Sequence, residues 1–179
     1  MDIRIEKTQR AIKNAFLELR VKKPLEKISV RELCEAACIN KSTFYSHYAD
    51  IYALSEALEI ETVNMIVNSI PHDRDYSAEN SDEFVRELCL AFVSHINLIN
   101  ILFPIKEHNN LSARLEVAVK DVIFNKYPAC RDDVEINIIL SFCIHGAYHT
   151  YLNNQNTDPD TLIRVIGDIA KNLRPLYRL

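Results

Sequence analysis

The sequence predicts an all-α protein, and three observations support this expectation. The 179 residues include only two glycines and six prolines. Positions with positive φ, which tight-turn sheets and glycine-rich phosphate loops require, are therefore scarce. Apolar residues make up 48% of the chain, enough for a hydrophobic core, and they recur at helical spacing in its N-terminal segments.

The first helix is expected between about Arg4 and Val21. Its apolar positions follow the spacing i, i+3, i+4, i+7 and are Ile12, Ala15, Phe16 and Leu19. Pro24 ends this helix, because proline cannot continue one. Ser29 then begins a second helix, and Glu32 three residues later is expected to complete a capping box with it.

A short third helix is expected from about Lys41 to His47, after a turn at Cys38–Ile39 and with Asn40 as its N-cap. Two short helices joined by a tight turn are the layout of a helix-turn-helix, whose second helix lies in the DNA major groove. The motif is expected over about residues 28–47.

The third helix has the residue types of a duplex reader. Ser42 and Thr43 are short, so the backbone can approach base edges closely. Lys41 and the amide groups at the helix start can meet phosphates. Tyr45 and His47 can bond phosphate oxygens through longer side chains. The alternative is an ordinary capped helix of a bundle that happens to be polar.

Phe44 and Tyr48, four residues apart, should face inward and hold the third helix against the first two.

Helices are also expected in the rest of the chain. A fourth helix is expected after Asp50, itself a candidate cap, and the polar segment Pro71–Asp82 predicts a linker. Asp158 is the expected N-cap of the last helix. The remaining expected helices span residues 83–102, 111–126, 132–153 and 159–173.

Charge divides unevenly along the chain, whose net charge is −4. Residues 1–48 carry ten Lys/Arg and six Asp/Glu, a balance of +4, which leaves −8 for the remainder. A basic N-terminal region can neutralise phosphates and release counterions, while an acidic remainder repels DNA. The charge pattern therefore favours a DNA-binding N-terminal region.

Residues 7–58 resemble the N-terminal domain of the TetR (TetR/AcrR) family of transcriptional regulators. The stretches that carry the resemblance are KKPLEKISV, RELCEAACIN, KSTFYSHY and DIYALSEAL. The resemblance implies a helix-turn-helix DNA-binding domain at 1–50, a helical effector-binding and dimerisation domain at 51–179, and a repressor function. On this resemblance the DNA contacts fall on Ser29, Val30, Lys41, Ser42, Thr43, Tyr45 and His47.

The sequence departs from the family pattern at two positions. Cys38 stands at the turn where the family has glycine, so a left-handed backbone there costs about 1 kcal/mol. Ile51 stands where the family has a lysine at the start of the fourth helix, so one phosphate contact is expected to be missing. The candidates to replace that contact are Lys22, Lys23 and Lys27.

The last two helices resemble those that, in the family, pack against a second copy of the chain. Gly146 lies within the first of them, where glycine costs stability relative to alanine, and close helix approach would explain it. One short recognition helix reads too few bases, so a homodimer on a palindromic double-stranded operator is expected. Its two recognition helices should lie roughly 34 Å, or a few turns further, apart.

Polar residues within apolar surroundings mark a candidate pocket for an unknown small-molecule effector. The candidates are His95, Asn97, Asn100, Phe103 and Phe142. Solvent-facing or capping roles are the alternative for the polar residues, and core packing is the alternative for the aromatic ones. An effector bound among the C-terminal helices is expected to change the spacing of the two recognition helices and to release the DNA.

Three other readings remain open. His145 and His149 lie at i, i+4, a spacing that can bind zinc, but Gly146 stands where a zinc protease has its glutamate base. Histidines hydrogen-bonded in a dimer interface are the preferred interpretation, and a metal-dependent enzyme that also uses Asp133 or Glu135 is the rival. A further alternative is a DNA-binding adaptor or activator controlled by a protein partner.

No catalytic residue, metal site or cofactor is expected. Five cysteines form an odd set that favours reduced thiols. The N-terminal stretch MDIRIEKTQR has no apolar core of a signal peptide. The longest apolar stretch, Cys89–Ile105, is too short and too polar to span a bilayer and predicts a buried helix. A cytoplasmic protein is therefore expected.

Overall fold

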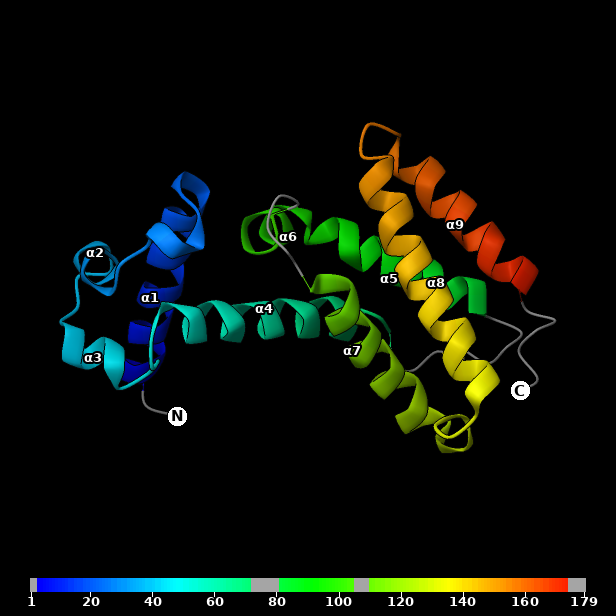
Figure 1. Cartoon of the computed structure of the whole chain (residues 1–179), viewed down its shortest axis with the longest axis horizontal. Coiled ribbons are helices and arrows are strands. Elements are labelled where there is room, and N and C mark those ends of the chain that lie inside the picture. Colours follow the sequence, from blue (N-terminus) through cyan, green and yellow to red (C-terminus); the bar gives the residue numbers. More distant parts are fainter. Residues whose placement is uncertain (1–2, 72–80, 105–109, 174–179) are drawn as a thin grey trace. The chain divides into compact units, whose positions relative to one another are not determined.

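The computed structural model describes residues 3–71, 81–104 and 110–173, and within these ranges the chain is helical, without strands. The expected all-α class is confirmed (Figure 1). The α-helices are α1 Ile3–Lys22, α2 Val30–Ala36, α3 Lys41–Tyr45, α4 Ile51–Asn68, α5 Ser81–Ser94, α6 Ile96–Leu102, α7 Leu111–Lys126, α8 Val134–Asn153 and α9 Pro159–Leu173. Two short 3₁₀ helices lie at Leu25–Lys27 and Pro128–Cys130.

The described residues form two compact units. The first unit contains residues 3–61 and 97–104, and the second contains residues 62–71, 81–96 and 110–173. Helix α4 continues from one unit into the other, so a boundary at residues 50/51, as expected from the sequence, differs from this division. Most of the expected linker Pro71–Asp82 lies outside the described residues.

The core of the first unit is built from one face of each helix. Ile12 and Phe16 of α1, Leu33 of α2 and Phe44 of α3 are fully buried. The start of α4 adds Leu54, which is also fully buried. The apolar spacing of the first three helices therefore directs their inner faces toward one another, and α2 packs on both α1 and α3.

Helix starts follow the capping rules read from the sequence. The side-chain oxygen of each cap accepts a hydrogen bond from the backbone N–H three residues later, at 2.7–3.2 Å. The confirmed caps are Ser29, Asn40, Asp50 and Asp158. The expected capping box is only half formed: the Glu32 carboxylate accepts from Lys23 Nζ at 2.5 Å.

The expected helix over residues 83–102 is broken into α5 and α6 at His95. Ser94 Oγ donates to the carbonyl of Ala91 at 2.8 Å, and His95 Nδ1 lies 2.8 Å from the same oxygen. The backbone N–H of His95 bonds the Phe92 carbonyl, three residues back. These side chains and the tightened last turn satisfy the carbonyls at the end of α5, which explains why the helix stops there.

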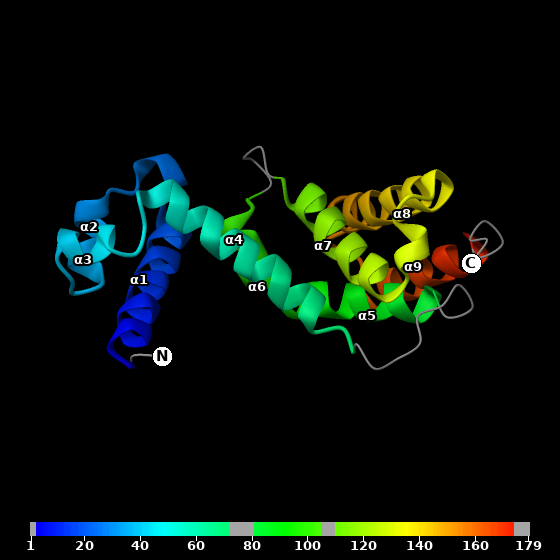
Figure 2. The same ribbon diagram turned by 90° about the horizontal axis from the view of Figure 1, so that it is seen from below.

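The second unit packs α5 against α9 and α7 against α8. Figure 1 and the perpendicular view of Figure 2 both show α8 lying along α7 and α9 lying along α5. A Cβ at Gly167 of α9 would lie 2.9 Å from Arg86 Nε. Glycine there lets the Arg86 side chain cross α9, and its Nη2 donates to Asp168 Oδ1 at 3.2 Å.

None of the described helices is by itself long and apolar enough to cross a membrane. Helices α5 and α6 meet that length and composition criterion only when they are counted together as a bent pair.

Candidate nucleic-acid interface

The turn between α2 and α3 is a Schellman motif. The N–H of Ile39 donates to the Cys34 carbonyl at 3.0 Å, and the N–H of Cys38 donates to the Glu35 carbonyl at 3.3 Å. Cys38 has a φ of 54°, the left-handed conformation expected from the family pattern, and no other non-glycine residue in the described ranges has a positive φ. The cysteine therefore occupies a conformation that favours glycine.

Helix α3 is held against the first unit by Phe44. This ring is fully buried, and it lies edge-on to Tyr45 with centroids 5.5 Å apart. Tyr48, also expected to face inward, is half-buried and its ring centroid lies 6.0 Å from that of Phe44. One aromatic residue thus fixes the helix, and the residues on the opposite face are left for solvent or a ligand.

The expected base-reading residues lie at the exposed start of α3. Lys41 and Ser42 are exposed, and Thr43 is half-buried. The Thr43 hydroxyl donates to Asn40 Oδ1 at 2.9 Å, so its proton is used by the cap while its oxygen keeps acceptor capacity. The side chain of Tyr45 is 56% exposed.

Helix α3 ends at Tyr45, two residues earlier than expected, so His47 lies in the following turn. The N–H of His47 bonds the Phe44 carbonyl three residues back, and Ser46 Oγ donates to the Thr43 carbonyl. These bonds close the last turn tightly. His47 is half-buried there.

The other two expected contact residues lie at the start of α2. Ser29 is exposed, and its hydroxyl oxygen accepts from the Glu32 N–H at 3.2 Å. Val30, the first residue of the helix, is half-buried. The structure thus brings all seven expected DNA-contact residues into one helix-turn-helix.

Ion pairs occupy several of the basic side chains near this motif. Lys23 pairs with Glu32, Arg31 pairs with Glu35 at 2.9 Å, and Lys13 pairs with Glu61. Ile51 is 5% exposed and belongs to the core. Of the three lysines considered as replacements for a basic residue there, Lys23 is thus neutralised, whereas Lys22 and Lys27 are exposed.

The two histidines of α8 do not form a metal site with described residues. His145 Nε2 lies 2.8 Å from Glu116 Oε2 of α7. Glu116 also accepts from Lys120 at 2.7 Å and from Ser141 at 2.5 Å. Within the described ranges no three His, Cys, Asp or Glu side chains are grouped as metal ligands require. Sequence reasoning missed this network, because it joins residues 29 positions apart.

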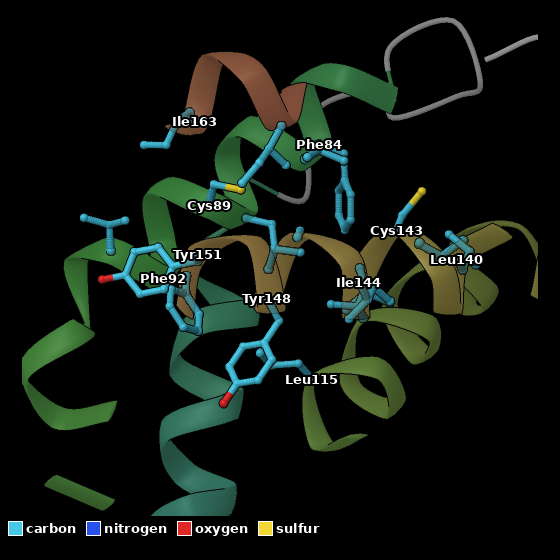
Figure 3. Close-up of a pocket in the computed structure, with 18 of the residues that line it drawn as sticks. Phe84, Cys89, Phe92, Leu115, Leu140, Cys143, Ile144, Tyr148, Tyr151 and Ile163 are labelled. Carbon is cyan, nitrogen blue, oxygen red and sulfur yellow. The ribbon is translucent and has the colours of Figure 1, made fainter. Parts of the chain in front are cut away.

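The second unit contains an apolar cavity of about 130 Å³ between α5, α7, α8 and α9. Figure 3 shows Phe84 of α5, Leu115 of α7 and Ile144 of α8 around this space. Its lining on α8 follows the buried positions Ile136, Leu140 and Ile144, a helical spacing that the sequence did display.

None of the five residues expected to form an effector pocket lines this cavity. Asn97 and Asn100 are exposed on α6, and Phe103 is buried just after it. His95 lies at the end of α5, where it contributes to the helix end. Phe142 is 67% exposed on α8. His95 thus lies at a helix break and the two asparagines at exposed positions, and the assignment of these residues to an effector pocket stays a prediction.

Helix α8 also carries an exposed apolar face. Val134, Ile138 and Phe142, spaced four residues apart, are 70%, 63% and 67% exposed. Gly146 continues the row, and apart from its own helix nothing in the described part of the chain lies within 4 Å of a Cβ built there. The neighbouring helix α9 exposes Ile169 to 52%. We call Val134, Ile138, Phe142 and Gly146 the α8 face.

Comparison with known proteins gives structural neighbours only. No protein-family model matches the chain, and no curated protein matches it. The transcriptional regulator FadR from Bacillus subtilis, solved in complex with stearoyl-CoA, is similar with a TM-score of 0.59 and 12% identity, over 92% of this chain and 96% of that one. The TetR family repressor AlkX from Dietzia sp. gives a TM-score of 0.48 and 16% identity, over 96% of both chains. The similarity to FadR shows a common fold.

Proposed function

We propose that this protein is a TetR-like transcriptional repressor that binds DNA through α2 and α3. The observation that carries the proposal is the Schellman turn at Cys38, which joins α2 to a short helix with a buried Phe44 and an exposed Lys41, Ser42 and Tyr45. A chain with the fold of a transcriptional regulator gives this motif its context. Helix α3 is then the recognition helix.

The residues of the motif have different roles in this proposal. Ser42 and Thr43 meet base edges, because their short side chains let the helix enter the groove. Lys41, Tyr45 and His47 bond phosphate oxygens and fix the register of the protein on the duplex. Ser29 and Val30 place the start of α2 against the backbone.

A homodimer formed through the C-terminal helices completes the DNA-binding unit. The α8 face exposes three large apolar side chains in a row, and Gly146 at its end allows a second helix to approach closely. A two-fold axis through such a face makes each copy cover the other's apolar residues. The same symmetry presents two recognition helices to a palindromic operator.

A small molecule bound in the cavity of the second unit is proposed to release the operator. The similar protein FadR was solved in complex with stearoyl-CoA, so this fold can hold a ligand with a large apolar part. Release requires that the effector bind the DNA-free spacing of the recognition helices more tightly than the DNA-bound one. An effector with equal affinity for both would leave repression unchanged.

The test is a selection of bound sequences from random duplex DNA, followed by binding measurements with single variants. We expect a palindromic site, and a loss of about tenfold or more in affinity for Lys41→Ala and for Tyr45→Phe. Lys41→Ala should also reduce the slope of log affinity against log salt concentration by about one unit per subunit, whereas Tyr45→Phe removes no charge and should leave that slope unchanged. Tyr45→Phe retains the ring that packs on Phe44, so any affinity that this variant loses is due to the missing hydroxyl.

Lys171→Ala is the matched control, because Lys171 is an exposed lysine at the end of α9, outside the helix-turn-helix. We expect it to bind the selected site like the unchanged protein. Equal binding by all three variants, or no sequence selected at modest salt, would contradict the proposal. If the protein binds the selected site as a monomer, the proposed helix-turn-helix contact stands and the proposed palindromic operator is contradicted.

A further inference from the structure

The cavity of the second unit has a lining that restricts the chemistry of its ligand. Carboxylate, amide, imidazole and aliphatic hydroxyl side chains are missing among its lining residues in the described ranges. Most of the lining is aliphatic or phenylalanine, with Leu115, Val119 and Ile163 as examples. The cavity therefore offers few hydrogen-bond partners and no permanent negative charge.

From this lining we infer that the cavity selects an uncharged, compact apolar molecule of about the size of one benzene ring. The inference rests on the proposed function, since it names the class of effector that the proposed regulator would bind. It differs from a simple transfer of the stearoyl-CoA seen with FadR, because it excludes a charged group from the cavity interior and because a volume of about 130 Å³ is too small for a whole long acyl chain.

The one charged side chain of the lining lies at the end of α7. Lys126 is exposed, and its Nζ lies 5.9 Å from the centroid of the Tyr127 ring. A cation in that position is already solvated and in contact with an aromatic face. An anionic group of a ligand could meet Lys126 only at this end, and the interior would receive the apolar part alone.

The remaining polar atoms of the lining are neutral thiols and phenols. Burial raises the pKa of Cys89 to about 11 and raises the pKa of Tyr151, so neither is ionised near pH 7. In Figure 3 the hydroxyl oxygens of Tyr148 and Tyr151 lie at the periphery of the drawn side chains. A buried carboxylate would lose its hydration without gaining a charged partner, which strongly opposes binding.

The volume of the cavity sets the size of the ligand. An apolar cavity of about 150 Å³ lined by Leu, Ile and Phe binds benzene in another protein, and the volume here is about 130 Å³. One ring, or a branched group of similar volume, therefore fits. Each additional buried methylene that does fit should tighten binding about fourfold, until the walls have to move.

The experiment compares toluene with benzoate on the full-length protein without DNA, by calorimetry and by thermal denaturation. The two probes have nearly the same shape and differ in charge. We expect toluene to raise the Tm by about 3–6 °C at ten times its Kd. Benzoate is expected to bind about 100-fold more weakly or not at all. Equal binding of the two probes, or no binding of toluene, would overturn the inference.

Variants locate the site within the unit. Ala147 of α8 lines the cavity, so Ala147→Leu fills it and should abolish the toluene response. The matched control is Ala113→Leu, which adds the same atoms at an exposed position of α7. Leu140→Ala enlarges the cavity and should move the preference from toluene to butylbenzene. This second variant keeps the test decisive if Ala147→Leu folds poorly.

Further measurements test the ligand class and the proposed function separately. Lys126→Gln should leave toluene binding unchanged, and a loss of binding would show that the ligand site depends on charge. Toluene that binds but leaves the operator complex intact would contradict the proposed release and keep the ligand class. If an octadecanoyl thioester releases the operator and toluene does not bind at all, the proposed release stands and the inference about the ligand class is overturned.

Discussion

The two units of the chain differ in how their helices pack. In the first unit, the short helices α2 and α3 are fixed by side-chain caps, by a Schellman turn and by one fully buried ring, Phe44. In the second unit, long helices enclose an apolar space and leave the α8 face exposed. The apolar cavity and the α8 face of the second unit are the places where we propose that a ligand and a second copy bind.

The largest expected effect tests the central residue of the first unit. Phe44→Ala should lower the free energy of unfolding by about 3–5 kcal/mol, because the ring is fully buried and contacts two neighbouring aromatic rings. Urea denaturation measures this loss. Tyr52→Ala, at a position 59% exposed in the same unit, should change stability by less than about 0.5 kcal/mol. Similar losses for both variants would mean that Phe44 does not hold the unit together.

The α8 face can be tested in the same way. Phe142→Glu should raise the dimer dissociation constant about 30-fold or more, because it places a charge in an interface that is otherwise apolar. Analytical ultracentrifugation measures it. Val117→Glu is the matched control, since Val117 is 63% exposed on α7, outside the α8 face. An equal effect of both changes, or none for Phe142→Glu, would place the dimer contact elsewhere.

A smaller effect concerns the polar network between α7 and α8. Hydrogen bonds from Lys120, Ser141 and His145 lower the pKa of Glu116 from 4.5 to about 2. Its stabilising contribution is therefore complete above pH 4.5 and is lost as the pH falls toward 2. Allowing for partial exposure, we expect about 1–2 kcal/mol.

Denaturation of Glu116→Gln at several pH values checks this network. The variant should be less stable than the unchanged protein at pH 6, and the difference should shrink as the pH decreases below 4.5. A constant difference over this range would show that the Glu116 charge contributes nothing and that the loss comes from packing.

The smallest expected effect is a gain in the free energy of unfolding. Cys38→Gly should stabilise the protein by about 0.5–1 kcal/mol, because glycine adopts a φ of 54° without the steric cost that a Cβ imposes. The extra freedom of glycine in the unfolded chain limits the gain. Cys38→Ala removes the thiol and keeps the Cβ, so it should give no gain in a thermal melt. Equal gains for both would assign the effect to the sulfur.

Local features of the fold could be predicted from the sequence. The caps Asn40 and Asp158 and the left-handed turn at Cys38 depend on residues within a few positions of each other, and the structure contains each of them. The helices α7 and α9 have the bounds expected from the sequence. Rules that act over one helical turn therefore describe individual helices in both units.

Features that depend on distant residues could not be predicted. Glu32 was expected to close its own capping box, but Lys23, nine residues away, takes its carboxylate. The break at His95 depends on a local contact with the Ala91 carbonyl four residues back, and it was not predicted either. The cavity lining comes from four helices, and no sequence pattern states which apolar faces meet without filling the space between them. The five residues assigned to an effector pocket do not line this cavity, and their assignment stays a prediction.

The turn at Cys38 also gives the protein a natural attachment point for a dye. All five cysteines lie in the described ranges, and among them Cys38 alone is exposed. Burial raises the pKa of Cys34, Cys89 and Cys130, which suppresses the thiolate that reacts with maleimides. A fluorophore introduced without any engineered residue would thus be located three positions before Lys41, where its emission would test the proposed binding of a duplex.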